Sequence, residues 1–194
     1  MSTRRNIYEW FYQQAKDEKQ LPWHREEIPL LLLEVAEAQT GRKKVLDIGC
    51  GTGVYSVYLA QQGYEVTAID FVASALEYAR QRADRERTLI NFIHTDITLW
   101  DTDEHFDIVL DSGCLHGFGG ADRKRYKERL LKWMNTKANY VLIHFARRSW
   151  LDLNFAGPRR KTRKEIERFF GPDLKLNLFY EDKARSLNQY IFGK

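Results

Sequence analysis

Asp47-Ile48-Gly49-Cys50-Gly51-Thr52-Gly53 is the stretch that decides the fold of this chain. The apolar run Lys44–Ile48 leads into it and predicts a short buried strand, and Val54–Gln62 after it predicts a helix that ends at Gly63. Glycines at such a turn let the backbone bend tightly and approach a ligand closely. Ligands of open parallel sheets bind beyond the carboxyl ends of the strands, so this stretch predicts a ligand-binding turn at that edge.

Strands and helices alternate along the following residues. Four apolar or alternating stretches predict strands, at Tyr64–Ile69, Leu89–His94, Phe106–Asp111 and Tyr140–Phe145. One predicted helix begins near Val72 and a basic one covers Asp122–Met134; the first places apolar residues on one face, at Val72, Ala75, Leu76, Ala79 and Ala83. Such alternation is typical of an α/β fold with a parallel sheet.

The C-terminal part is expected to end the sheet with a hairpin. Thr162–Phe170 predicts a helix, with Thr162 as N-cap and Glu165 completing a capping box. A short polar stretch separates Leu174–Tyr180 from Leu187–Phe192, so the two are predicted to pair as antiparallel strands. We therefore expect an α/β fold, with a doubly wound, mostly parallel seven-stranded sheet and an antiparallel terminal hairpin strand.

The N-terminal residues 1–40 are predicted to form a helical cap or lid on a ligand-binding domain of residues 41–194. The cap contains an aromatic-rich helix around Tyr8, Trp10 and Tyr12, and a second helix from about Ile28 to Ala38. The segment Leu21-Pro22-Trp23-His24 joins them. The aromatic side chains either close over the site or simply fill the core, and the sequence leaves both interpretations open.

Composition excludes several classes of protein. The chain has 194 residues, 43% hydrophobic and 30% charged, and a net charge of +4, which suits one soluble globular domain. The mild basic clusters Arg123–Arg129 and Arg159–Lys164 predict solvated faces, so nucleic acid is not expected as a partner. No signal peptide, membrane segment or metal site is expected. Two cysteines, Cys50 and Cys114, favour a reduced, cytoplasmic protein.

The glycine spacing of the turn does not fit a nicotinamide cofactor. The fingerprint of that class is G-x-G-x-x-G or G-x-G-x-x-A. Started at Gly49 it ends on Val54, and started at Gly51 it ends on Ser56. An acidic residue that opens the glycine run instead resembles motif I of the class I S-adenosylmethionine (SAM)-dependent methyltransferases. The resemblance runs from about Trp23 to the C-terminus.

This resemblance implies a Rossmann-like methyltransferase fold and SAM as cofactor, with S-adenosylhomocysteine (SAH) as product. Asp70 ends the second strand nineteen positions after Gly51, where an acidic residue holds a ribose; capping of the next helix is its alternative role. Family members place the residue after this Asp on the adenine ring. The implied cofactor-binding residues are Trp23, Asp47, Gly49, Cys50, Gly51, Gly53, Asp70, Phe71, Asp96, Ile97 and Asp111. Of these, Asp96 and Ile97 would meet the adenine, and Asp111 the methionine end.

The segment after the fourth strand bears on the methyl acceptor. It reads Asp111-Ser112-Gly113-Cys114 and lacks the D/N-P-P-Y/F motif of many nucleic-acid and protein methyltransferases. With Leu21-Pro22-Trp23-His24, it resembles the small-molecule thiopurine, tellurite-resistance and thiol methyltransferases. His116 is the candidate general base and His144 a second one. The basic residues that flank the insertion after the fifth strand raise the hypothesis of an acidic acceptor; they are Arg147, Arg148, Arg159, Arg160 and Lys161.

Two other functions remain open. The basic helix around Arg123–Arg129 would suit an RNA- or protein-modifying methyltransferase, and the cofactor turn alone would suit a non-catalytic SAM-binding protein. In either case a monomer or homodimer is expected. The acceptor itself, and whether it must lose a proton, do not follow from the sequence.

Overall fold

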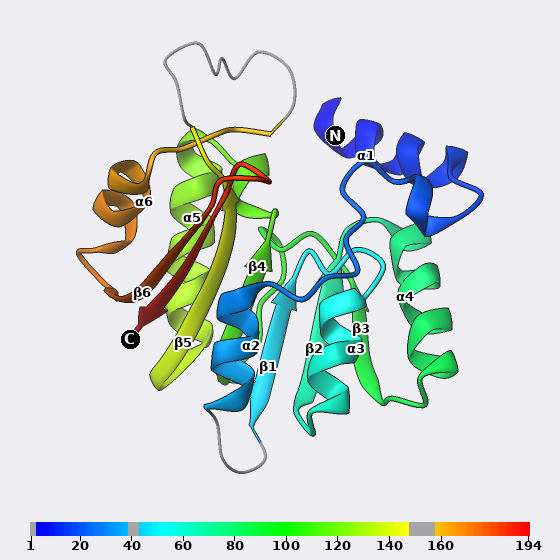
Figure 1. The fold of residues 1–194 in the computed structure, drawn as a ribbon, viewed down its shortest axis with the longest axis horizontal. Helices are drawn as coiled ribbons and strands as arrows, with labels where there is room; N and C mark the ends of the chain where they lie inside the picture. Colours follow the sequence, from blue (N-terminus) through cyan, green and yellow to red (C-terminus); the bar gives the residue numbers. More distant parts are fainter. Residues whose placement is uncertain (1–2, 39–42, 148–157) are drawn as a thin grey trace.

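The computed structural model of the chain describes residues 3–38, 43–147 and 158–194 (Figure 1). Its centre is a seven-stranded sheet of order β3-β2-β1-β4-β5-β7-β6. Strands β1 to β5 run parallel, whereas β7 is antiparallel to β5 and to β6. The doubly wound sheet with a terminal antiparallel hairpin is therefore confirmed. The strands are β1 Lys44–Ile48, β2 Glu65–Asp70, β3 Ile90–His94, β4 Phe106–Ser112, β5 Met134–Phe145, β6 Lys175–Asp182 and β7 Leu187–Gly193.

Helices cover both faces of this sheet, as buried parallel strands require. Val45 of β1 packs in one apolar cluster with residues of α2 and α3, and its neighbour Leu46 packs in the opposite cluster with α5 and α6. This alternation follows from the two-residue period of a strand. The helices are α1 Thr3–Gln14, α2 Leu30–Glu37, α3 Val54–Gln61, α4 Ala73–Arg85, α5 Gly120–Trp133 and α6 Arg163–Phe170. Short 3-10 turns lie at Glu18–Gln20 and Leu115–Gly117.

The starts of α6 and β5 show how accurately the sequence pattern located the ends of helices and strands. The capping box at the start of α6 is confirmed, because Glu165 accepts from the Thr162 backbone N–H at 2.8 Å and Thr162 Oγ1 accepts from the Glu165 N–H at 3.3 Å. The fifth strand, predicted to begin at Tyr140, begins at Met134. Lys137 has a φ of +68° and lies where the pairing with β4 shifts register. This irregularity hides the first part of the strand from the sequence pattern.

The predicted N-terminal region divides into two parts in space. Helix α1 lies across the carboxyl ends of the strands, beside α4 (Figure 1), where the Tyr78 hydroxyl donates to the Ala15 carbonyl at 3.0 Å. Helix α2 instead packs in the core of the sheet, and its Leu31 N–H donates to Gln189 Oε1 of β7 at 3.0 Å. The predicted boundary at residue 40 lies outside the described residues. Of the predicted cap, α1 and the segment that follows it cover the edge where ligands bind.

Gly53 shows why the cofactor turn needs a third glycine. It is the N-cap of α3, with φ of +76°, and a Cβ at this position would lie 2.9 Å from the Cβ of Ala79 on α4. The backbone of α3 therefore packs directly on α4. The role of Gly53 in this structure is close helix packing.

Replacement of Gly53 with alanine is expected to lower the unfolding free energy by about 2 kcal/mol or more, from overpacking and the left-handed backbone together. Gly63→Ala is the matched control, because Gly63 has φ of +88° but no atom within 4 Å of a new Cβ. It should cost about 1 kcal/mol, from the backbone alone. Urea unfolding measures both, and a double-mutant cycle with Ala79→Gly should show favourable coupling. Equal losses in the two alanine variants would contradict this packing.

Candidate functional site

A cavity of about 1250 Å³ opens at the carboxyl ends of the parallel strands, under the N-terminal segment. Single ligands usually occupy about 300–1,000 Å³, so this cavity has room for a cofactor and a second reactant. Most residues predicted for the site line it, namely Trp23, Asp47, Gly49, Cys50, Gly51, Asp70, Phe71, Asp96, Ile97 and His116. Gly53 and Asp111 are not among the lining residues.

The glycine turn is held to the end of β2 by its own backbone. The N–H groups of Gly49 and Cys50 both donate to the Ile69 carbonyl, at 2.8 and 3.0 Å. The Gly51 N–H donates to Asp70 Oδ2 at 2.9 Å, and the Val72 N–H donates to Asp70 Oδ1 at 2.9 Å. Asp70 thus clamps the turn and also binds the N-cap residue of α4, so the two roles considered for it are compatible. Each of its oxygens keeps a further lone pair for a ligand hydroxyl.

Three carboxylates are concentrated behind this turn. Asp47, Asp70 and Asp111 are each less than a tenth exposed, and none of them forms an ion pair with a described residue. The pKa of Asp47 is raised to about 7, mainly by burial and also by the negative charges of Asp111 and Asp70, against a 2.5 Å hydrogen bond from Ser56. Burial also raises the pKa of Asp70, and that of Asp111 to about 6. The site therefore favours a cationic ligand.

Asp47→Asn is expected to change how stability depends on pH. The native pKa of about 7 lies above the unfolded value of 3.8, so the neutral carboxyl stabilises the fold at low pH and this stability is lost as pH rises through 7. The asparagine cannot ionise. The unfolding free energy of Asp47→Asn relative to that of the wild type should therefore increase by more than about 1.4 kcal/mol between pH 4.5 and 8. A pKa shift of one unit corresponds to that free energy. Urea unfolding across this range measures the change, with Asp84→Asn on the exposed face of α4 as control; parallel curves would contradict the assignment.

Asp111 requires a correction. It was expected at the methionine end of the cofactor, but its carboxylate is fully buried and accepts from the Tyr126 hydroxyl at 2.6 Å and from the N–H groups of Cys114 and Leu115 at 2.7 and 2.9 Å. These bonds point it away from the cavity and into the loop after β4. Asp111 therefore shapes that loop. The loop in turn brings Cys114 against Gly49, where an added Cβ would lie 3.1 Å from Cys114 Cβ.

Asp96 and Ile97 lie at the cavity edge as expected. Asp96 Oδ1 accepts from the N–H and the hydroxyl of Thr98, at 2.8 and 2.7 Å, which fixes the carboxyl group. No described residue donates to its Oδ2. Ile97 is buried, and Phe71 is half-buried at the same end of the cavity. Contacts of these residues with an adenine ring stay a prediction.

Aromatic side chains of the N-terminal segment form the cover of the cavity. Trp23 Nε1 donates to the Tyr12 hydroxyl at 3.3 Å, and the Trp23 ring lies 5.1 Å from that of Tyr8 and 5.3 Å from that of Phe11, centroid to centroid. Tyr12 is buried against residues of α4. Tyr8, Tyr12 and Trp23 therefore belong to a small core and line the cavity at once, so both interpretations of the aromatic segment hold for them. Trp10 is 55% exposed and does not line the cavity, so neither interpretation holds for it.

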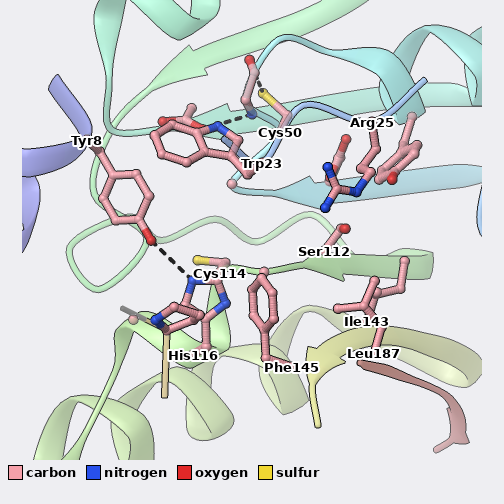
Figure 2. Close-up of a pocket in the computed structure, with 18 of the residues that line it drawn as sticks. Tyr8, Trp23, Arg25, Cys50, Ser112, Cys114, His116, Ile143, Phe145 and Leu187 are labelled. Carbon is pink, nitrogen blue, oxygen red and sulfur yellow. Dashed lines mark hydrogen bonds between the residues drawn. The ribbon is translucent and has the colours of Figure 1, made fainter. Parts of the chain in front are cut away.

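Tyr8 reaches from this cover to His116 on the opposite wall. The Tyr8 hydroxyl lies 3.1 Å from His116 Nε2, and Figure 2 shows the contact closing one end of the cavity. The Phe145 ring packs edge-on against the His116 ring at 5.0 Å. Sequence reasoning missed Tyr8 as a site residue, because 108 positions separate it from His116 and no local pattern marks the contact.

The remaining wall is apolar with few polar groups. Ile143, Phe145 and Leu187 line it, with Ser112 and Arg25 across from them (Figure 2). Ser112 faces Tyr55 of α3, which also lines the cavity and whose pKa is raised by burial and lowered by Ser112. This half of the cavity lies beyond the carboxyl ends of β4 and β5. It is the part that a second reactant would occupy.

Of three other candidates, two do not line the cavity and the third lies outside the described residues. His144 does not line it, its Nδ1 bonds the Phe145 carbonyl at 2.9 Å, and burial lowers its pKa to about 4, so the second candidate base is wrong. Arg147 pairs with Glu165 at 2.8 Å, at the start of α6. Arg148 lies outside the described residues. The hypothesis of an acidic acceptor therefore does not rest on this pair.

Neither cysteine has the features of a nucleophile, and the described residues contain no cluster of metal ligands. Cys50 and Cys114 are free, and burial raises the pKa of both thiols well above the usual value. Both stay protonated, which disfavours a cysteine nucleophile. Within residues 3–38, 43–147 and 158–194, no group of three His, Cys, Asp or Glu side chains could hold a metal ion, and no helix is long and apolar enough to span a membrane.

Comparisons with known proteins point to one activity. A family described as a methyltransferase domain matches residues 45–137. An uncharacterized methyltransferase of Schizosaccharomyces pombe is 35% identical over 105 residues, 54% of this chain and 72% of the relative. A 2-heptyl-1-hydroxyquinolin-4(1H)-one methyltransferase of Mycobacteroides abscessus is 27% identical over 126 residues, 64% of this chain and 56% of the relative. The N-methyltransferase NodS of Bradyrhizobium japonicum, solved with SAH, has a TM-score of 0.78 at 18% identity, covering 100% of this chain and 99% of NodS.

Proposed function

This chain belongs to the class I SAM-dependent methyltransferases, and from that premise we propose that it methylates a small-molecule acceptor held beside β4 and β5. The observation that carries the proposal is the shape of the cavity. It continues from the glycine turn at Gly49–Gly51 to the apolar wall of Phe145 and Leu187, and Tyr8 and Trp23 cover it. A covered cavity of this size suits a small acceptor better than an RNA or protein chain.

The residues on the cofactor side fit SAM. The buried carboxylates favour its positive charge, and the free lone pairs of Asp70 suit the two ribose hydroxyls. A Cβ on Gly51 would lie 3.1 Å from the Tyr12 hydroxyl, so only glycine leaves the turn open below the cover. Phe71 and Ile97 offer apolar faces for the adenine ring. When bound, SAM supplies an electrophilic methyl group on a sulfonium.

His116 is the residue that we propose as general base when the acceptor carries a proton. Its Nε2 takes that proton, directly or through the Tyr8 hydroxyl 3.1 Å away, as the acceptor forms its bond to the methyl carbon and SAH leaves. Tyr8 and Phe145 fix the ring in place. The same cover excludes water, so the chain's main contribution is alignment of the reactants.

Radiolabelled SAM and three classes of acceptor test this proposal. The small-molecule class contains 2-heptyl-1-hydroxyquinolin-4(1H)-one, after the M. abscessus relative, with 3,4-dihydroxybenzoate and an aryl thiol. The other classes are total tRNA and a mixture of basic proteins. We expect label in a small molecule only. Transfer to tRNA that falls steeply with salt would favour the basic α5 as a docking surface, and SAM binding without any transfer would favour a non-catalytic protein.

A further inference from the structure

Arg159 lies at the rim of the acceptor half of the cavity, and the charge of Arg123 on α5 acts on it. The Arg159 guanidinium lies directly on Gly119, where a Cβ would force the arginine side chain to move. Arg123 lies in the first turn of α5, which begins at Gly120. Its pKa is lowered by burial, and the positive charge of Arg159 lowers it further. The two like charges therefore act on each other, and the Arg123 guanidinium stacks 4.5 Å from the Phe169 ring centroid without lining the cavity.

Both guanidinium groups keep donors that are not satisfied. Arg159 Nε is buried without a hydrogen-bond partner, and so are Arg123 Nε and Nη2, among the residues that the structure describes. A buried donor without a partner costs about 1–3 kcal/mol, and more for a charged group. Such a cost at Arg159, which lines the cavity, indicates a site for a ligand that accepts hydrogen bonds.

The carboxylates of the neighbouring elements are engaged elsewhere. Glu165 of α6 accepts from Arg147 and from the Thr162 N–H, both at 2.8 Å. Asp122 is exposed and pairs with Arg125 on the same helix, at 3.5 Å. The tyrosines closest to Arg123 are neutral at physiological pH, because burial raises the pKa of Tyr126 and Tyr140. Because Arg123 is engaged by the Phe169 ring and the charge of Glu165, the positive charge left for a ligand is that of Arg159.

The backbone adds to this preference. Gly119 and Gly120 line the cavity just where the fourteen-residue α5 begins. The first N–H groups of a helix lack partners within the helix, and its N-terminus carries a partial positive charge. Glycine at both positions leaves these groups uncovered. Arginine forks and helix N-termini both suit carboxylate or phosphate oxygens.

We propose that Arg159, beside the start of α5, binds an oxyanion group of the methyl acceptor, so that the acceptor is an anionic small molecule. This inference rests on the proposed function. The anion belongs to the acceptor because Arg159 follows β5 in the chain and lies on Gly119 at the start of α5, whereas the glycine turn and Asp70 that fit the cofactor lie at the ends of β1 and β2. Phe145, with the Arg160 guanidinium carbon 5.6 Å from its ring centroid, separates this rim from His116 and gives the acceptor an apolar middle.

Calorimetric titration of the SAH-saturated protein tests the subsite without catalysis. The probes are 3,4-dihydroxybenzoate, the uncharged catechol that lacks its carboxylate, and inorganic phosphate. We expect the carboxylate probe to bind at least about tenfold tighter than catechol, as one charge-assisted bidentate contact allows. Arg159→Gln should reduce this preference to less than about threefold, and Arg159→Lys should restore part of it. Arg147→Gln is the matched control, because it removes an equal charge nearby and should keep the preference.

The other possible results of this titration would each contradict the subsite or the proposed function. Absence of a carboxylate preference in the wild type, or its survival in Arg159→Gln with an unchanged melting temperature, would overturn the subsite. Phosphate that binds as tightly as dihydroxybenzoate would identify a site for a free anion, and weaker SAH binding in Arg159→Gln would assign the arginine to the cofactor. Failure of SAH to bind at all would instead refute the proposed function.

Discussion

Asp70→Ala is expected to weaken SAM binding by about 2–4 kcal/mol, roughly 30- to 1,000-fold, in a calorimetric titration. The loss has two sources, because the carboxylate is predicted to hold the ribose and is seen to hold the turn. Without it the Gly51 and Val72 N–H groups lose the partners that fix the backbone under the cofactor. The expected effect is therefore larger than that of one lost ligand contact.

Two comparisons separate these sources. Asp70→Asn keeps one acceptor oxygen and should lie between wild type and alanine. Asp84→Ala removes the same charge from the exposed face of α4, and its affinity for SAM should equal that of the wild type. An Asp70→Ala protein that binds SAM within about twofold of the wild type would rule out the ribose assignment, since even one charged hydrogen bond is worth more.

His116→Asn is expected to lower the rate of methyl transfer to a proton-bearing acceptor by about 100- to 10,000-fold, the usual contribution of a general base. Affinity for SAM should not change, because His116 lies on the acceptor side of the cavity. Higher pH should recover part of the rate, since the acceptor then ionises without help. Single-turnover assays with the small molecule that accepts label in the panel measure both effects.

Tyr8→Phe and His105→Asn complete this test. Tyr8→Phe removes the hydroxyl that contacts Nε2 and should cost about tenfold in rate, less than loss of the base itself. His105 is exposed, so His105→Asn serves as the control for loss of a histidine and should behave as the wild type. A His116→Asn rate near that of the wild type would mean that alignment alone drives transfer.

Local features of the chain were predictable from sequence. The strand Lys44–Ile48 and its glycine turn were located because an apolar run and left-handed glycines are short-range signals. The capping box of Thr162 and Glu165 is local for the same reason. Antiparallel pairing at the end of the sheet followed from the short polar connection before Leu187.

Directions of side chains and contacts between distant residues were not predictable. Asp111 stands at the end of its strand as expected, yet the Tyr126 hydroxyl and the loop backbone turn it away from the cavity. The contact of Tyr8 with His116 joins the two ends of the site and depends on where α1 lies. The same is true of Arg159 and Arg123, whose proximity depends on the packing of α5 beside β5.

Titration of the protein with SAM, SAH and NAD tests the central claim most directly. The carboxylates and the glycine turn, with Asp70 as the expected ribose acceptor, predict micromolar binding of SAM and SAH, and the glycine spacing predicts no binding of NAD. Absence of binding by both adenosyl compounds would contradict the account.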